Sequence, residues 1–110
     1  MPTPRVLIVE DEPLVAMDLE LTVKEIIAAE IVVAPSVSST RAAMAEPLDF
    51  AFPDGKTFEI ALELRRNEVP FVFVSGARPE AVPPDLRGAP FIPKPFERHL
   101  IARALRRRSD

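Results

Sequence analysis

Five short apolar runs, separated by segments with helical spacing, constrain what this chain can fold into. The runs cover residues 5–9, 31–34, 48–52, 70–74 and 90–92. Their β-branched and aromatic residues form near-continuous apolar stretches, which is typical of strands that are buried on both faces of a sheet. Strands that alternate with helices favour a parallel sheet, because each crossover returns the chain to the same edge. We therefore expect an α/β protein with a doubly wound five-stranded parallel sheet and helices on both faces.

The segments between the runs carry helix signals. Residues 14–29 have an apolar stripe, and Pro13 is suited to the first turn. Residues 38–45 predict a short helix with Ser38 or Ser39 as its N-cap. Residues 57–66 and 96–107 predict two more helices. Residues 78–88 contain three prolines and a glycine, so we expect only a short, poorly formed helix there.

Length and composition narrow the class of protein. A chain of 110 residues that is 47% hydrophobic suits one domain, so we expect residues 1–110 to form a single domain without a separate DNA-binding or catalytic domain. No segment has the length and apolarity of a membrane span, and the start of the chain has no signal-peptide pattern. The absence of cysteine excludes disulfides and thiolate metal sites, and we expect a cytoplasmic protein.

Basic residues gather near the C-terminus of a chain whose formal charge is −3. Residues 97–110 hold five arginines and two acids. Such a run is more often a solvated helix end that complements the helix dipole than a nucleic-acid site, and no aromatic residues interleave with it. We therefore expect no nucleic-acid partner. His99 lies in the middle of this predicted helix, and we expect it to be an ordinary surface residue.

Side chains suited to chemistry follow the ends of four runs. Glu10 and Asp11 follow the first, Asp54 the third, Ser75 the fourth and Lys94 the fifth. The carboxyl ends of parallel strands meet at one edge of a sheet, so we expect these groups to lie together. Crowded carboxylates repel unless a cation neutralises them, and a hard divalent ion, most simply Mg²⁺, would do so. The hydroxyl and the ammonium could then bind an anion beside the metal, as phosphoryl transfer requires.

Several of these residues also have an ordinary structural explanation. Glu10, Asp11 and Glu12 could cap the first helix, where anions are favoured. Ser75 could be a turn residue before Gly76. Lys94 lies between two prolines, which is an awkward context for a surface lysine. The combination of acids, hydroxyl and lysine on separate strands favours a functional site.

Three segments resemble the response-regulator receiver domains of bacterial two-component signalling, which have a flavodoxin-like fold. The segments are Val6-Leu-Ile-Val-Glu-Asp-Glu-Pro13, Pro70-Phe-Val-Phe-Val-Ser-Gly76 and Pro93-Lys-Pro-Phe96. The resemblance runs over nearly the whole chain. The second and third segments look most like the single-domain subset with a Phe-x-Thr/Ser-Gly signature.

The resemblance implies a role for each candidate residue. Glu10 and Asp11 would hold Mg²⁺ together with the acceptor aspartate, Ser75 would be the hydroxyl switch, and Lys94 would contact the phosphoryl group. Phe91 would be the aromatic switch, and Lys94-Pro95 would be a cis peptide. Receivers take a phosphoryl group from a kinase histidine onto an aspartate at the end of the third strand. They are not enzymes beyond self-catalysed phosphotransfer and autodephosphorylation.

The acceptor itself stays open between two aspartates. Asp49-Phe-Ala-Phe-Pro-Asp-Gly55 aligns with the family pattern Asp-x-x-Leu-Pro-x-Gly, which would make Asp49 the acceptor, 26 residues before Ser75. However, Asp49 is only 38 residues after Asp11, and this register puts Glu46-Pro47 inside a buried strand. Asp54 lies 43 residues after Asp11 but only 21 before Ser75. The chain therefore lacks a few residues here, and Asp54, Asp49 or no residue is the acceptor.

We predict a phosphorelay receiver whose partners are a sensor histidine kinase or phosphotransfer protein and a downstream protein. The alternative is a degenerate receiver fold that docks partners without phosphorylation. A homodimer through the last helix or residues 78–92 is compatible with the pattern. Strand exchange at an exposed sheet edge is compatible with it too.

Overall fold

Strands and helices alternate along the chain as the apolar pattern predicts. The computed structural model describes residues 3–54, 58–76, 83–86 and 88–107. The strands are β1 (Arg5–Val9), β2 (Glu30–Ala34), β3 (Phe50–Phe52), β4 (Phe73–Ser75) and β5 (Phe91–Pro93). The helices are α1 (Pro13–Ile26), α2 (Val37–Ala43), α3 (Phe58–Arg66) and α4 (Arg98–Arg107), with a 3₁₀ turn η2 at Pro84–Leu86. None of the helices described is long and apolar enough to cross a membrane.

All the strand pairs are parallel, but they fall into two sheets. β1 lies between β2 and β3, and β4 pairs with β5. The two sheets meet where Ala51 forms an isolated bridge with Phe71 and where the Val74 N–H donates to the Pro53 carbonyl at 3.1 Å. The expected five-strand parallel arrangement is therefore confirmed, with a weak junction between β3 and β4. Prolines flank this junction, and proline cannot donate to a ladder.

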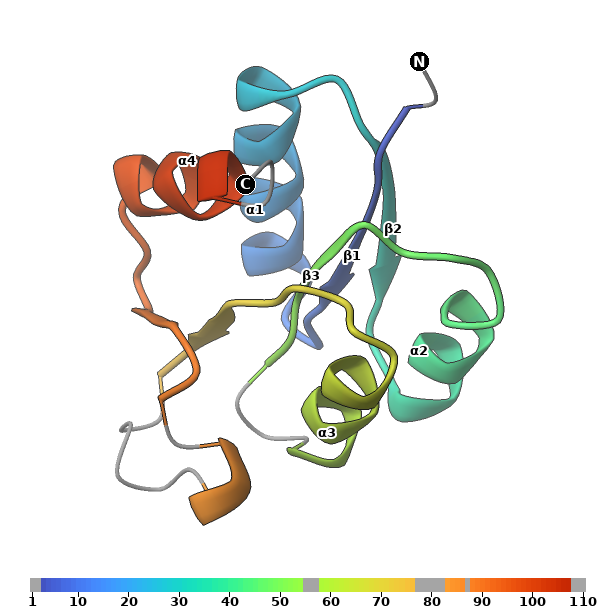
Figure 1. Ribbon diagram of the computed structural model, residues 1–110. Coiled ribbons are helices and arrows are strands. Elements are labelled where there is room, and N and C mark those ends of the chain that lie inside the picture. The colour runs from blue at the N-terminus through green and yellow to red at the C-terminus, as the bar shows by residue number, and fades with distance from the viewer. Residues whose placement is uncertain (1–2, 55–57, 77–82, 87, 108–110) are drawn as a thin grey trace.

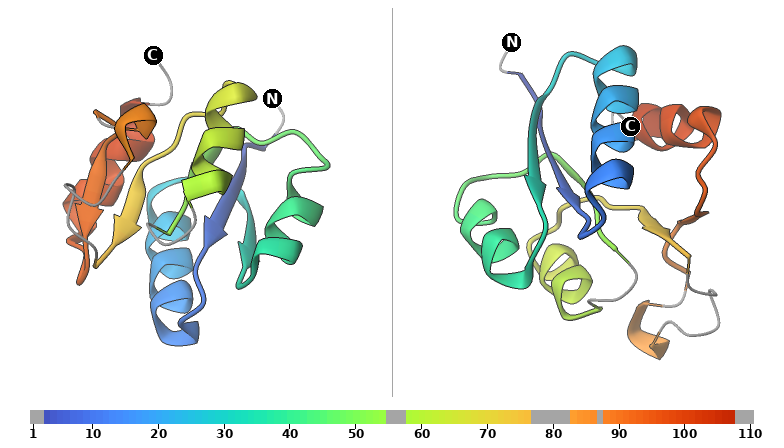
Figure 2. Two further views of the ribbon diagram at one scale, coloured as in Figure 1. Left: turned by 90° about the horizontal axis from the view of Figure 1, so that it is seen from below. Right: turned by 180° about the vertical axis from the view of Figure 1, so that it is seen from behind.

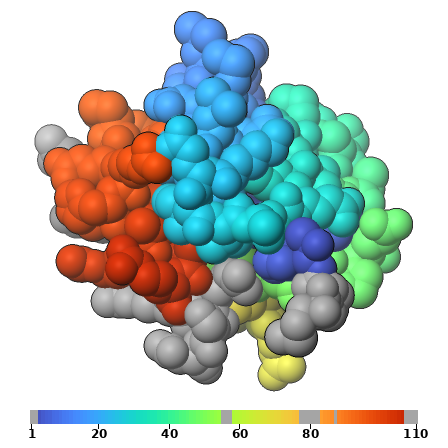
Figure 3. All heavy atoms as spheres, turned by 90° about the horizontal axis from the view of Figure 1, so that it is seen from above, coloured from blue at the N-terminus to red at the C-terminus, as the bar shows by residue number. Residues whose placement is uncertain are grey.

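Helices cover both faces of the sheets, as Figures 1 and 2 show. On β1, Val6 and Ile8 face the core beneath α1 and α4, whereas Leu7 and Val9 face the core beneath α2 and α3. Figure 3 shows α1 and α4 side by side on the surface of the molecule. Because both faces of β1 are covered, its sequence has no polar alternation.

Several boundaries differ from those predicted. α2 begins at Val37 because Ser36, rather than Ser38 or Ser39, is its N-cap: the Ser36 Oγ accepts from the Ser39 N–H at 3.2 Å, and the Ser39 Oγ accepts from the Ser36 N–H. α1 ends at Ile26, three residues before its predicted end. α4 begins at Arg98, and η2 is the short helix expected in the proline-rich segment.

The strands are also shorter than the apolar runs. β4 starts at Phe73 because the preceding Phe71 bridges to Ala51 on β3 instead of pairing with β5. β3 is confined to Phe50–Phe52. The predicted first residue of the third helix, Thr57, and residues 78–82 of the proline-rich segment lie outside the described residues.

Candidate functional site

The carboxyl ends of four strands bring the predicted polar residues together. Glu10 directly follows β1, Asp54 follows β3 by two residues, Ser75 is the last residue of β4, and Lys94 directly follows β5. Glu10, Asp54 and Ser75 are 2%, 4% and 2% exposed. Burying ionised carboxylates is costly unless they are paired, so two buried acids at one edge require a nearby cation.

Lys94 supplies that cation. Its Nζ lies 2.5 Å from Glu10 Oε1 and 3.9 Å from Asp54 Oδ2, so Glu10 is its nearer partner. Its backbone N–H donates to the Ser75 carbonyl at 3.1 Å, which fixes β5 against the end of β4. The Lys94-Pro95 peptide is cis, as the receiver resemblance implied.

The surroundings of Lys94 hold its side chain in the charged form. Burial by itself lowers the pKa of Lys94, because an ammonium is less well solvated inside the protein. The hydrogen bond that the Lys94 ammonium donates to Glu10, and the negative charges of Glu10, Asp54 and Glu12, outweigh burial and raise this pKa above the ordinary 10.5. Lys94 is therefore an ammonium at neutral pH, available to bind an anionic oxygen.

Three consecutive acids form a compact oxygen cluster at the same edge. One carboxylate oxygen from each of Glu10, Asp11 and Glu12 lies within 4.8 Å of the others. The Glu12 N–H donates to Glu10 Oε2 at 3.1 Å. Glu12 occupies the N-cap position of α1, but its side chain makes no capping hydrogen bond. A capping hydrogen bond therefore does not account for Glu12. The receiver resemblance assigns no ligand role to Glu12, although it adjoins Asp11 in the sequence.

The donor set of this edge fits a hard divalent cation. Among the described residues, Glu10, Asp11 and Glu12 form the oxygen cluster, and Lys94 is the cation that pairs with Glu10 and Asp54. Excess negative charge on oxygen ligands is the environment in which Mg²⁺ binds. A cavity of about 140 Å³ opens here, lined by Glu10, Asp11 and Asp54 and by residues leading into α2. The residues present can hold such an ion, because Asp54 lines the same cavity as Glu10 and Asp11.

Asp49 lies at the opposite end of β3 from this site. It is exposed, its Oδ2 accepts from the Arg5 N–H at 2.8 Å, and its own N–H donates to the Arg5 carbonyl at 2.9 Å. Both partners belong to the first residue of β1. The structure therefore brings Asp54, and not Asp49, to Glu10 and Lys94.

Two other candidate residues lie outside the polar cluster. Phe91 begins β5, is half-buried, and packs its ring 5.5 Å from that of Phe73. His99 is exposed on α4, with Nδ1 3.3 Å from Glu97 Oε2. The expectation that His99 is a surface residue is confirmed.

Solved structures share the fold of this chain over almost all of its length. The PhyR response regulator REC domain of Erythrobacter litoralis is 24% identical with a TM-score of 0.84, over 99% of this chain and 92% of that one. SdrG of Sphingomonas melonis Fr1 is 29% identical with a TM-score of 0.80, over the whole of both chains. A CheY-like response regulator receiver domain of Methylobacillus flagellatus is 18% identical with a TM-score of 0.82, over 97% and 99%. Neither a protein-family model nor a curated protein matches the chain.

These similarities agree with the receiver-like segments of the sequence and with the parallel strand order. They extend across both sheets, because each comparison covers nearly every residue. The chain therefore has the fold of response regulator receiver domains.

Proposed function

We propose that this chain is a phosphorelay receiver in which Asp54 accepts a phosphoryl group from a histidine of a sensor kinase or phosphotransfer protein. The observation that carries the proposal is the position of Asp54, buried at the carboxyl edge with Lys94 Nζ at 3.9 Å. Asp49, the other candidate, is exposed and bonded to Arg5 at the amino edge. A nucleophile for phosphoryl transfer needs adjacent groups that neutralise phosphoryl oxygens, and Asp54 has them.

The transfer step follows from these residues. A carboxylate oxygen of Asp54 attacks phosphorus, and the bond between phosphorus and the imidazole nitrogen breaks with its electron pair remaining on nitrogen. Glu10, Asp11 and Asp54 would hold Mg²⁺, which supplies charge neutralisation when bound. Lys94 exchanges a carboxylate partner for a phosphoryl oxygen, and the Ser75 hydroxyl donates to another. The chain acts as an acceptor, with no catalysis beyond its own transfer and dephosphorylation.

A protein donor is favoured by the surface beside the site. α1 begins just after the acidic cluster, and its large exposed apolar side chains are Leu14, Met17 and Leu21. Their spacing places them on one face of the helix. A donor histidine that reaches Asp54 brings its own protein across this face. The output is then a shift of Ser75 and Phe91 that alters the surface around β4, β5 and α4.

Mass spectrometry tests the assignment of Asp54 directly. The protein is incubated with Mg²⁺ and a small acyl phosphate, and any adduct is located by peptide mapping. We expect one phosphoryl adduct on the wild type and on Asp49→Ala, and none on Asp54→Ala. An adduct that persists in Asp54→Ala, or that disappears in Asp49→Ala, contradicts the assignment.

The alternative, a docking module that works without phosphorylation, rests on the short connection after Asp54. α3 already begins at Phe58, four residues further on. This alternative predicts no adduct on any variant and no Mg²⁺-dependent binding of beryllium fluoride, a phosphoryl mimic. Beryllium fluoride binding that needs Mg²⁺ and is lost in Asp54→Ala excludes it.

A further inference from the structure

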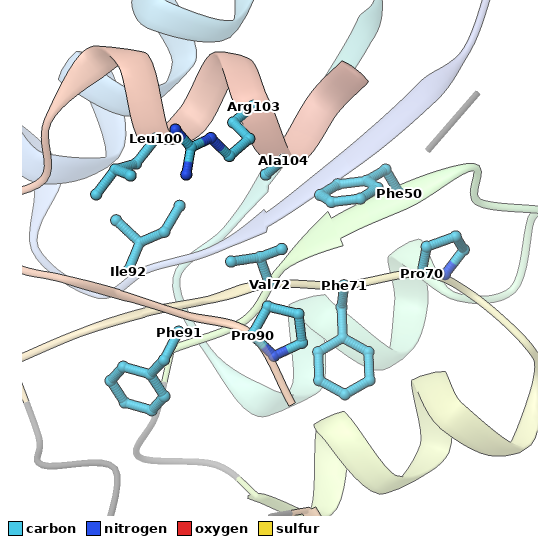
Figure 4. Close-up of a pocket in the computed structure, with 10 residues that line it drawn as sticks. All are labelled: Phe50, Pro70, Phe71, Val72, Pro90, Phe91, Ile92, Leu100, Arg103 and Ala104. Atoms are coloured by element: carbon cyan, nitrogen blue, oxygen red, sulfur yellow. The ribbon is translucent and has the colours of Figure 1, made fainter. Parts of the chain in front are cut away.

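A larger cavity lies at the opposite end of β4 and β5, beneath α4. It has a volume of about 290 Å³. Its walls come from β3, from the segments that lead into β4 and β5, and from α4, as Figure 4 shows. Phe50, Phe71, Val72, Ile92 and Leu100 are among the apolar residues that line it. None of Glu10, Asp11, Asp54, Ser75 and Lys94 lines it, but Phe91, which is proposed to shift with Ser75, does.

Arg103 is the one charged residue among the described residues that line the cavity. Its side chain extends beside Leu100 and over Ile92 in Figure 4. Within the described part of the chain, Arg103 makes no ion pair or hydrogen bond, whereas its neighbours on α4 do: Arg98 pairs with Glu25, and the Arg106 Nε donates to the Ala102 carbonyl. Arg103 is exposed, so its guanidinium can pair with the carboxylate of a ligand that occupies the apolar cavity.

The size and walls of the cavity limit the anion to a small one with an apolar body. A cavity of about 150 Å³ lined by apolar side chains holds one benzene molecule. About twice that volume accommodates a ring with a short acidic arm. The Phe50 and Phe71 rings offer edge or face contacts to such a ring. A carboxylate suits Arg103 because its two oxygens match the guanidinium fork, and because it is less strongly hydrated than a phosphate dianion.

We propose that this cavity binds a small aromatic carboxylate, with the ring between Val72, Ile92 and Phe71 and the carboxylate on Arg103. The site is separate from Asp54 and does not depend on phosphorylation. It nevertheless lies along the same two segments of chain as Ser75 and Lys94. Val72 precedes Ser75 by three residues, and Ile92 precedes Lys94 by two.

A titration followed by amide chemical shifts of the full chain tests this proposal. The probe is 3-phenylpropanoate, and 3-phenylpropanamide serves as the uncharged analogue. We expect shifts centred on Val72, Ile92 and Leu100, and an affinity about tenfold weaker for the amide or for Arg103→Gln. Arg106→Gln removes the same charge from the same helix outside the cavity, and we expect it to bind the acid within about twofold of the wild type.

Three results would overturn the proposal. The first is the absence of shifts at millimolar acid, and the second is equal affinity in Arg103→Gln and the wild type. The third is a set of shifts centred on Glu10 and Lys94, which would place the acid at the phosphoryl site. An acidic aromatic peptide that binds here when the free acid does not would assign the cavity to a protein partner.

Discussion

Asp49 and Asp54 are five residues apart, yet they lie at opposite edges of the sheet. An extended strand rises about 3.3 Å per residue, so five residues carry the chain about 16 Å. The family pattern Asp-x-x-Leu-Pro-x-Gly favoured Asp49, because such a pattern compares only the types of residue and their order along the chain. Placement depends instead on the register of β3 against β1, where Val6 pairs with Phe50. Two hydrogen bonds join Asp49 to Arg5, one to the Asp49 carboxylate and one between main-chain atoms. They hold Asp49 beside the amino end of β1.

Lys94 makes a pH-dependent contribution to stability that its raised pKa defines. A lysine whose pKa is raised on folding stabilises the folded state fully below its unfolded pKa, and that contribution is lost as pH rises through the folded value. We expect the difference in unfolding free energy between the wild type and Lys94→Met to be constant from pH 7 to about 10. Above the ordinary value of 10.5 it shrinks. Urea denaturation in the presence of a chelator at each pH measures this difference.

Lys24 provides the control for this pH series. It is exposed on α1 and pairs with Glu20 at 3.3 Å, one turn away. Surface pairs of this kind contribute little, so Lys24→Met should differ only slightly from the wild type at every pH. A Lys94→Met difference that grows above pH 10 would contradict the assignment of Glu10 and Asp54 as its partners.

The start of α2 shows how an element boundary escapes sequence reasoning. Ser36, Ser38 and Ser39 are all good N-cap residues, and their order in the chain does not choose among them. The choice follows from where β2 ends, because Ala34 is the last paired residue of that strand and Pro35 cannot donate to a ladder. Ser36 is then extended and Val37 is the first helical residue. Helix type and existence were predictable, whereas the exact first residue depended on a neighbouring strand.

Replacing the cap tests this boundary. Ser36→Ala removes the oxygen that accepts from the Ser39 N–H, and we expect a loss of about 1 kcal/mol in unfolding free energy. Ser38→Ala, at the predicted cap position, should cost clearly less. Urea denaturation followed by far-ultraviolet circular dichroism suits the chain, which has no tryptophan or tyrosine. Equal losses of unfolding free energy in the two variants would contradict the assignment of Ser36 as the N-cap.

At the scale of the whole molecule, alternation and the carboxyl-edge rule predicted both the parallel architecture and the meeting of Glu10, Asp54, Ser75 and Lys94. The split of the sheet was not predictable, because it follows from pairing between residues far apart in the chain. The same holds for the cavity beneath α4 and for the phenylalanine cluster around Phe73. Patterns along the sequence indicate which face of a strand is buried, but not which distant side chains meet there.

Phe73 provides the test of cooperativity across the molecule. It is fully buried, and its ring centroid lies 5.4 Å from that of Phe71, 5.5 Å from Phe91 and 6.2 Å from Phe58. Phe73→Ala should cost about 3–5 kcal/mol, a large part of the stability of a domain this size. Phe71→Ala, at a half-buried position, should cost less. A loss below about 1 kcal/mol for Phe73→Ala in thermal or urea unfolding would show that this cluster, which joins β4 and β5 to α3, contributes little to the stability of the fold.

The hydrogen bond from the Lys94 N–H to the Ser75 carbonyl fixes where these two residues lie, whereas their side chains determine the chemistry at that place. Main-chain atoms hold these two residues side by side, so their spacing does not depend on which side chains they carry. Evolution can therefore exchange the Ser75 hydroxyl without first redesigning the scaffold, whereas loss of the Lys94 ammonium would leave Glu10 and Asp54 buried without this cation. A lineage could lose or regain reactivity at this edge by single substitutions while the backbone beneath it stays unchanged.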